Sequence, residues 1–355
     1  FIDTDGEVTL MSQSEHYAPL PTPTPREPAP NLVGEFNPGS STLSYAKSVY
    51  VEGSYAYISG YDSDNLIIVD INDRTNPQLA SEYRPGTGTL EGGVGIFYYN
   101  NHAYITGFLS DNLIIVDAAD PENISLAANY KPGTGTLEFP YGLHVENNHA
   151  YIAAASDNLM ILDITDPDNP SIANNYQPGE STLSYARSVF VEGNYAYVAG
   201  ASSNNVLILN VTDPENPSLA ANYNPGTSFL EWPEDIYVDG NYAYITGSIT
   251  NNLIILDVTD PENPSLAANY NPGTGTFSEP SQIFVDSGYA YVTGASNDNV
   301  YIINVTDPEN PSLFDEYHPG ATELHHTSGV YGDGEYLYVT AKFSDNMHIL
   351  DLFPD

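Results

Sequence analysis

The stretch NNLIILDVTDPENPSLAANYNPGTGTF, at Asn251–Phe277, decides the fold because most of it recurs along the chain. The copy before it, Asn205–Phe229, reads NVLILNVTDPENPSLAANYNPGTSF. The copies contain Pro-Gly pairs that begin at residues 38, 85, 132, 178, 225, 272 and 319, a spacing of 46 or 47 residues. A period in the forties with strand-like text is typical of one four-stranded blade per repeat. The sequence therefore predicts an all-β protein, a seven-bladed β-propeller.

Four strands are expected in each repeat. The first two, as at Ser48–Glu52 and Tyr55–Ser59, flank a two-residue turn of the kind that joins β-hairpins. The third, as at Leu66–Asp70, is apolar on both faces, as expected for a blade packed between two others. The fourth, as at Leu266–Tyr270, follows an Asp-Pro-Glu-Asn-Pro turn and precedes Pro-Gly, where glycine suits the positive φ of a type II turn.

The strand count also predicts how the ring closes. The last repeat supplies only three strands, the third of them at Met347–Leu352, and a spare fourth strand, Leu32–Phe36, stands near the other end of the chain. We therefore expect Leu32–Phe36 to complete the last blade, which closes the ring non-covalently and leaves no open first or last blade. The expected organisation is an N-terminal extension at 1–18, a Pro-rich linker at 19–31 and the propeller at 32–355.

The repeated strand and its turn resemble a known family. NLIIVD and NLIILD, followed by Asp-Pro-x-Asn-Pro, are similar to the LVIVD-repeat family of β-propellers, over Leu32–Phe353. Members of that family are mostly exported or cell-surface proteins of bacteria and archaea, so the resemblance implies such a location. The family motif contains no catalytic residue, and none is carried over to this chain.

The amino-acid composition excludes several classes of binding partner and of functional site. The chain has 7 Lys and Arg against 47 Asp and Glu, a formal net charge of −40, which repels nucleic acid and anionic membranes. It has no cysteine, which excludes disulfides, thiol catalysis and cysteine-based zinc sites. No apolar run approaches the ~18 residues of a membrane span, so no insertion is expected. The lack of cysteine, the few lysines and the many Tyr, Asn, Gly and Thr residues favour an extracellular or cell-surface protein.

Alignment by the period places one residue of each repeat at the entrance of the axial channel. These entry positions are Lys47, Val94, Tyr141, Arg187, Glu234, Ser281 and Ser328, and the next positions are Ser48, Gly95, Gly142, Ser188, Asp235, Gln282 and Gly329. The candidate site residues among them are Lys47, Tyr141, Arg187, Glu234 and Asp235. Two interpretations stay open. The residues form an anion or carbohydrate site, or they form a salt-bridged plug in which Glu234 pairs with Lys47 or Arg187.

Other candidate sites each have a structural alternative. The Asp-Pro-Glu-Asn-Pro turns offer oxygens that Ca²⁺ prefers, but one turn supplies too few ligands, so no cofactor is expected and calcium stays a minor alternative. The pair His325–His326 lacks an evident third metal ligand. Trp232 and Phe139 are candidates for stacking a sugar or a partner, or for packing between blades. The candidate glycosylation sites are Asn123, which is expected to be the most exposed, Asn210 and Asn304.

The N-terminal extension contains a strand-like segment, Glu7–Met11, that predicts self-association. The residues Glu7, Val8, Thr9, Leu10 and Met11 would add a strand to the sheet edge of a neighbouring subunit, with the Pro-rich linker as a stiff spacer. The favoured function is therefore an exported structural protein that assembles into a filament or surface layer. The alternatives are an extracellular module that binds glycan or protein at the loop face or channel mouth, and a polysaccharide-active enzyme. No motif of the common hydrolases, nucleotide-binding proteins or zinc peptidases occurs, so no catalytic residue is proposed.

Overall fold

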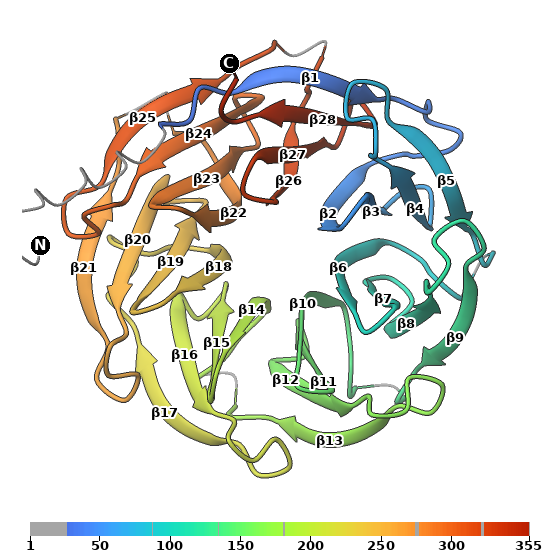
Figure 1. The fold of residues 1–355 in the computed structure, drawn as a ribbon. Helices are drawn as coiled ribbons and strands as arrows, with labels where there is room; N and C mark the ends of the chain where they lie inside the picture. Colours follow the sequence, from blue (N-terminus) through green and yellow to red (C-terminus); the bar gives the residue numbers. More distant parts are fainter. Residues whose placement is uncertain are drawn as a thin grey trace, which may run out of the picture.

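The computed structural model describes residues 27–354, except 87, 134, 180–181, 274–276 and 321–322. These residues form seven four-stranded antiparallel sheets, arranged as blades around a central axis (Figure 1). The predicted fold class, the seven-bladed propeller, is confirmed. The segment Glu7–Met11 lies outside the described residues. Within the described part of the chain, no helix is long and apolar enough to cross a membrane.

In six of the seven blades the strands run outward from the axis in chain order. The first blade consists of β2 (Ala46–Glu52), β3 (Tyr55–Gly60), β4 (Asn65–Asp70) and β5 (Gln78–Tyr83). The next five blades repeat this order: β6 (Gly93–Tyr99), β7 (His102–Gly107), β8 (Asn112–Asp117), β9 (Ser125–Tyr130); β10 (Pro140–Glu146), β11 (His149–Ala154), β12 (Asn158–Asp163), β13 (Ser171–Tyr176); β14 (Ala186–Glu192), β15 (Tyr195–Gly200), β16 (Asn205–Asn210), β17 (Ser218–Tyr223); β18 (Pro233–Asp239), β19 (Tyr242–Gly247), β20 (Asn252–Asp257), β21 (Ser265–Tyr270); β22 (Pro280–Asp286), β23 (Tyr289–Gly294), β24 (Asn299–Asn304) and β25 (Ser312–Tyr317). The glycine of every Pro-Gly pair has positive φ, as the turn chemistry predicts.

The hydrophobic core lies between neighbouring blades. The third strands are its centre, and in β4 the side chains of Leu66, Ile67, Ile68 and Val69 have no exposed surface. One face of each third strand packs on the preceding blade and the other on the following blade, so the core is a series of layers around the ring. This arrangement explains why the repeated NLIIVD-type segments carry no polar alternation.

The N-terminal strand closes the ring. The last blade has the order β1-β28-β27-β26, with β1 at Asn31–Phe36, β26 at Thr327–Gly332, β27 at Tyr336–Ala341 and β28 at Asn346–Asp351. β1 pairs antiparallel with β28, and Phe36 lies opposite Met347. The predicted closure is confirmed, and β1 begins one residue earlier than expected, at the end of the predicted linker.

A polar contact recurs at every junction between blades. The residue before each third strand accepts a hydrogen bond, through Oδ1, from a backbone N–H at the channel mouth of the next blade, at 2.6–3.0 Å. The acceptor and donor pairs are Asp64 with Gly92, Asp111 with Phe139, Asp157 with Tyr185, Asn204 with Trp232, Asn251 with Glu279, Asp298 with His326 and Asp345 with Tyr45. The last pair joins the final blade to the first.

Removing the acceptor at the ring closure should destabilise the protein. In Asp345→Ala the Tyr45 N–H loses its partner at a half-buried position, and the free energy of unfolding should fall by about 1–2 kcal/mol. Asp345→Asn is the matched control. It should keep wild-type stability, because asparagine is the acceptor at two other junctions. Urea unfolding of the three proteins checks this, and an alanine variant as stable as wild type would contradict it.

Candidate functional site

Four layers of residues, one residue per blade in each, surround the axial channel from its mouth inward. The mouth layer is Tyr45, Gly92, Phe139, Tyr185, Trp232, Glu279 and His326, the residues that donate the junction hydrogen bonds. The second and third layers are the two sets aligned from the sequence, beginning at Lys47 and Ser48. The fourth layer is Tyr50, Phe97, His144, Phe190, Tyr237, Phe284 and Tyr331. Each layer is set by the register of the innermost strands.

The mouth opens into a cavity of about 690 Å³. Its lining includes Lys47, Tyr141, Arg187 and Glu234 from the second layer, and Lys342 from the loop after β27. Below it, the third and fourth layers enclose about 150 Å³ of further space. The structure therefore brings four of the five sequence-predicted site residues into one cavity and places the fifth, Asp235, directly beneath them.

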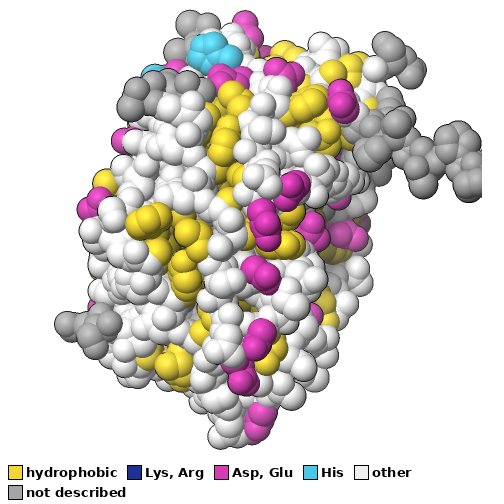
Figure 2. Space-filling model, turned by 90° about the vertical axis from the view of Figure 1, so that its left-hand side faces the viewer, with side chains coloured by type: hydrophobic (Ala, Val, Ile, Leu, Met, Phe, Trp, Pro, Cys, Tyr) yellow, Lys and Arg dark blue, Asp and Glu magenta, His cyan; other side chains and the backbone are white. Residues whose placement is uncertain are grey.

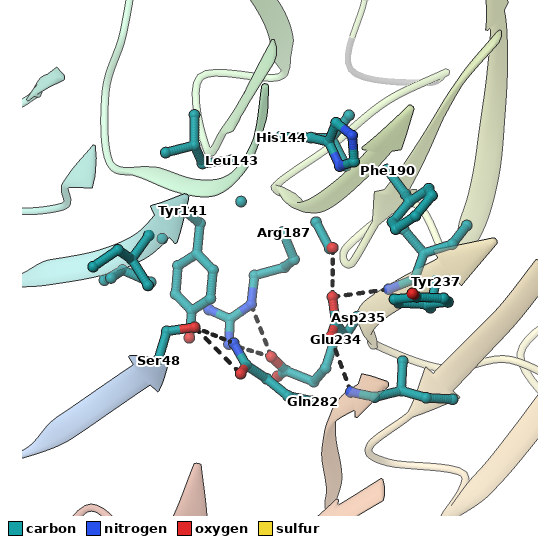
Figure 3. A pocket seen from close by; sticks show the side chains of 18 of the residues that line it. Ser48, Tyr141, Leu143, His144, Arg187, Phe190, Glu234, Asp235, Tyr237 and Gln282 are labelled. Carbon is teal, nitrogen blue, oxygen red and sulfur yellow. Dashed lines mark hydrogen bonds and ion pairs between the residues drawn. The ribbon is translucent and has the colours of Figure 1, made fainter. Parts of the chain in front are cut away.

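Arg187 and Glu234 form the polar centre of the second layer (Figure 3). The Arg187 Nε donates to Glu234 Oε2 at 3.0 Å, and the guanidinium carbon lies 3.8 Å from the centre of the Tyr141 ring. Trp232 Nε1 donates to the other oxygen, Oε1, at 2.9 Å. Burial acts to lower the pKa of Arg187, but Tyr141 and the Glu234 carboxylate outweigh it, so the pKa is raised and the guanidinium stays charged. Glu234 thus has both oxygens satisfied by the protein.

Two lysines at the mouth have no carboxylate partner among the described residues. Lys47 Nζ lies 5.2 Å from the centre of the Tyr141 ring, and Lys342 Nζ lies 4.2 Å from the centre of the Tyr45 ring. The ion pairs of the described residues are Arg74–Asp333, Arg84–Glu82 and Arg187–Glu234, so neither lysine has a carboxylate oxygen within 4 Å there. Burial acts to lower the pKa of Lys47, but Tyr141 and Glu234 offset it, and the pKa is raised. The cavity therefore keeps two cations available for an anion.

Asp235 is part of the channel wall and its oxygens are occupied. Its Oδ1 accepts from Ser188 Oγ at 2.6 Å and from the Ile236 N–H at 3.0 Å, and its Oδ2 accepts from the Ile283 N–H at 3.0 Å. These contacts join three consecutive blades around the axis. The carboxylate therefore braces the channel and offers no free oxygen to a ligand.

Asp235 should give the protein a measurable dependence of stability on pH. Burial raises the pKa of this carboxyl from 3.8 to about 6. The folded state holds the proton more tightly than the unfolded chain, so the favourable contribution is complete below the unfolded pKa and is lost as the pH rises through about 6. Asp235→Asn cannot ionise, so the unfolding free energy of wild type relative to this variant should fall between about pH 4 and pH 6. Urea unfolding of both proteins across this range checks it, and a difference that does not change with pH would contradict it.

The fourth layer is a closed belt of rings that the sequence analysis missed. Each ring contacts the next around the axis, with centroids 4.6–5.5 Å apart from Tyr50 through all seven members and back to Tyr50. Burial lowers the pKa of His144 to about 3, so its neutral imidazole packs as one more ring. The belt forms the lower end of the cavity. Its signal was present in the sequence, because the seven residues align by the same period two positions after Ser48 and its equivalents.

The mouth layer is built on strained backbone. Six of its residues are not glycine, and their φ angles lie between +47° and +61°, in Tyr45, Phe139, Tyr185, Trp232, Glu279 and His326. A bulky residue in this left-handed region costs roughly 1–2 kcal/mol. Such strain is typical of sites where the surrounding structure holds a side chain for a function. Here it presents large side chains at the channel mouth.

Because of this strain, replacing Trp232 with glycine should destabilise the protein less than replacing it with alanine, the reverse of the usual order. Trp232→Ala keeps a Cβ at φ +57°, whereas Trp232→Gly removes it, and both variants lose the same indole contacts. The glycine variant should therefore be more stable than the alanine variant by about 1 kcal/mol. Chemical denaturation of both variants checks this. An alanine variant that is the more stable of the two would show that the position is not strained.

The remaining candidates lie apart from the second layer or have a structural role. His325 and His326 both pack against the Phe343 ring, and burial lowers the pKa of His326 to about 4. The described residues contain no group of three or more His, Asp and Glu side chains placed to hold a metal ion. Trp232 is half-buried against the Tyr185 ring, whereas Phe139 is 43% exposed. Asn123 is exposed and Asn210 and Asn304 are half-buried, so glycosylation stays a prediction with Asn123 as the most accessible site.

The fold and the cavity define a seven-bladed β-propeller with a polar axial mouth. The family model of the LVIVD repeat matches residues 44–84, 142–177, 184–225 and 233–272. The chain therefore carries LVIVD repeats within a seven-bladed β-propeller, as its repeated strand predicted. No curated protein matches the sequence.

Many solved structures are similar in fold. One is a functionally unknown protein from Desulfotomaculum acetoxidans DSM 771, at 13% identity and a TM-score of 0.66, over 84% of this chain and 92% of that one. Another is a streptogramin B lyase, at 13% identity and a TM-score of 0.68, over 90% of this chain and 96% of that one. A computationally designed protein, Ika8, matches at 8% identity and a TM-score of 0.64, over 90% of this chain and 99% of that one. Likeness at such identities shows the fold alone.

Proposed function

We propose that this protein is a binding module that takes a carboxylate-bearing sugar at the mouth of its axial channel. The observation that carries the proposal is the placement of Lys47 and Lys342. Three of the chain's seven Lys and Arg residues line this one cavity, and these two have no carboxylate partner within the described residues. The chain has 47 acidic residues that could pair with these lysines, yet both stay unpaired within the described residues. This arrangement favours a site that binds an external anion.

Aromatic faces beside the lysines favour a sugar over a simple anion. The rings of Tyr45 and Tyr141 lie under the two ammonium groups, and Trp232 is a further ring in the cavity wall. Ring faces pack on the apolar faces of sugars, while the lysines would bind the acid group. The net charge of −40 does not prevent this, because charges more than ~8 Å from the cavity are largely screened at physiological salt.

The proposal is tested by calorimetric titration with galacturonate and with galactose. The two sugars differ in carrying a carboxylate or a hydroxymethyl group at the same carbon. Galacturonate should bind at least about tenfold more tightly, since a charged hydrogen bond contributes about 1.5–3 kcal/mol. Equal affinities, or no binding of galacturonate up to high millimolar concentration, would contradict the proposal.

Self-assembly is a second candidate function, supported by the rim of the ring. Every blade ends in an outer strand with one open edge, and six of the seven carry an exposed apolar side chain near the start of that strand, 38–49% accessible. These residues are Leu32, Leu79, Leu126, Ile172, Leu219 and Leu266. Figure 2 shows apolar and acidic side chains on one side of the ring, with no lysine or arginine in view. Open edges with apolar side chains are the surface that strand addition uses.

The expected donor, Glu7–Met11, lies outside the described residues, so its role is tested by deletion. Removing Phe1–Ala18 should convert any assembly into monomers with unchanged β content. Light scattering after size-exclusion chromatography reads the mass of both forms. A truncated protein that still assembles, or a full-length protein that is monomeric at high concentration, excludes this function. An extracellular setting, expected from the composition, suits both candidates and stays a prediction.

A further inference from the structure

We infer that the ligand is an acidic oligosaccharide rather than a single sugar, because an arc of aromatic side chains beside the cavity forms a second subsite. The aromatic arc consists of Phe343, Tyr45, Tyr61, Phe108 and Phe139. The inference rests on the proposed function, since it extends the site that would hold the acid group.

The arc is continuous from one blade to the next. Ring centroids are 6.1 Å apart between Phe343 and Tyr45, 4.9 Å between Tyr45 and Tyr61, 6.1 Å between Tyr61 and Phe108, and 5.1 Å between Phe108 and Phe139. These residues come from the last blade and from the first three blades. The arc thus crosses four of the seven blades on the face that carries the channel mouth.

The arc breaks the symmetry of a chain whose repeats are otherwise nearly alike. The position just after each second strand is aromatic only in the first two blades: in ring order it is Tyr61, Phe108, Ala155, Ala201, Ser248, Ala295 and Lys342. The next position is Leu109 and Phe343 on the same side of the ring, and the other five blades have Asp62, Ser156, Ser202, Ile249 and Ser296 there. Packing between blades does not require these rings, since small residues occupy the same position in four blades. The aromatic side chains therefore need another explanation.

Exposure supplies that explanation. Phe343 is 54% exposed, Leu109 51% and Phe139 43%, on a surface where an exposed apolar patch marks an interaction site. Gly92 replaces the bulky mouth residue of the other blades at the middle of the arc. A Cβ there would lie 3.1 Å from both Leu109 and Tyr61, so the glycine lets these side chains pack closely beside the mouth.

The positive charges beside the arc indicate which ligand it binds. Lys342 lies beside the first two rings of the arc, with its Nζ 4.2 Å from the Tyr45 ring centre and 5.1 Å from that of Phe343. An acid group held by Lys342 and Lys47 would therefore place the next sugars of the same chain over the arc. The arc itself carries no basic residue, so its contacts suit the faces of sugar rings. The occupant we commit to is a short chain of uronic acid residues.

The test compares galacturonic acid with its di-, tri- and tetramer by calorimetry, with maltotetraose as the neutral chain. For the wild-type protein, the tetramer should bind at least about tenfold more tightly than the monomer, and maltotetraose should bind far more weakly than the tetramer. Phe139→Gly and Phe108→Ala should each weaken tetramer binding about fivefold and leave monomer binding within about twofold. Phe229→Ala is the matched control, because Phe229 is 41% exposed and outside the arc, and it should change neither.

The outcomes distinguish a failure of the aromatic arc from a failure of the proposed binding site. Monomer binding with no gain from monomer to tetramer overturns the aromatic arc and leaves the proposed function intact. The same holds if Phe139→Gly and Phe108→Ala bind the tetramer as wild type does. No binding of any member of the series overturns both.

Discussion

Deleting residues 27–36 should open the ring and lower the free energy of unfolding by about 5 kcal/mol or more, the largest stability effect that we expect. β1 is the partner of the outer edge of β28, and its Phe36 is 6% exposed within the first core cluster. Glu35 Oε1 also accepts a hydrogen bond from Asn346 Nδ2 at 2.9 Å. Losing a buried aromatic residue costs roughly 3 kcal/mol, and the lost hydrogen bonds cost about 1 kcal/mol each.

The control for this deletion is the removal of residues 1–18, which lie before the closing strand. That truncation should unfold at the wild-type urea concentration, whereas deletion of 27–36 should shift the midpoint strongly or yield protein that does not fold. A synthetic peptide of residues 27–37, added in excess, should restore part of the lost stability because it binds the folded state. Wild-type stability of the 27–36 deletion would contradict the closure.

The double variant Lys47→Gln/Lys342→Gln should lose about 100-fold or more in affinity for galacturonate. Each lysine is expected to contribute a charged hydrogen bond of about 1.5–3 kcal/mol to the carboxylate, and a factor of ten is about 1.4 kcal/mol. Glutamine keeps most of the side-chain volume, and neither lysine has an ion pair within the described residues to lose. The variant loses the two contacts with tyrosine rings, which contribute about 0.5–1 kcal/mol each, so it should stay folded. Calorimetric titration of the folded variant measures the loss.

Lys131→Gln is the control for charge alone. Lys131 Nζ donates to the Ser110 carbonyl at 2.6 Å and is not among the residues that line the cavity, yet its substitution changes the net charge by the same step as each mouth variant. It should bind galacturonate as wild type does. If the double variant also binds normally, the lysines do not hold the acid, and the proposed site is wrong.

The fold was predictable because its determinants are local and repeated. A period of 46 or 47 residues, an apolar third strand such as Leu66–Asp70 and a proline-rich turn each specify one step of a blade, and seven copies reinforce one another. The closing strand followed from counting, since the last repeat lacked its fourth strand. The observed strands differ from the predicted ones mainly at their ends. There, bulges and turn geometry determine which residue makes the last hydrogen bond of the strand.

The site was predictable only in part, because it depends on contacts between side chains of different blades. The sequence left open whether Glu234 pairs with Lys47 or Arg187, and the structure pairs it with Arg187. The hydrogen bond from the Ile283 backbone to Asp235 spans adjacent blades, so no local pattern indicates it. The aromatic belt was hidden for a different reason. Rings such as Tyr50 and Phe190 look like ordinary strand residues until the seven copies are aligned.

The most direct test of the proposed function uses Trp232, the single tryptophan of the chain, whose indole bonds Glu234 inside the cavity. Its fluorescence therefore reports on the mouth alone. Titration with galacturonate should change the emission in a saturable way, galactose should not, and Lys47→Gln/Lys342→Gln should abolish the change. Emission that stays constant while calorimetry records galacturonate binding would place the ligand elsewhere on the protein and contradict a binding site at the channel mouth.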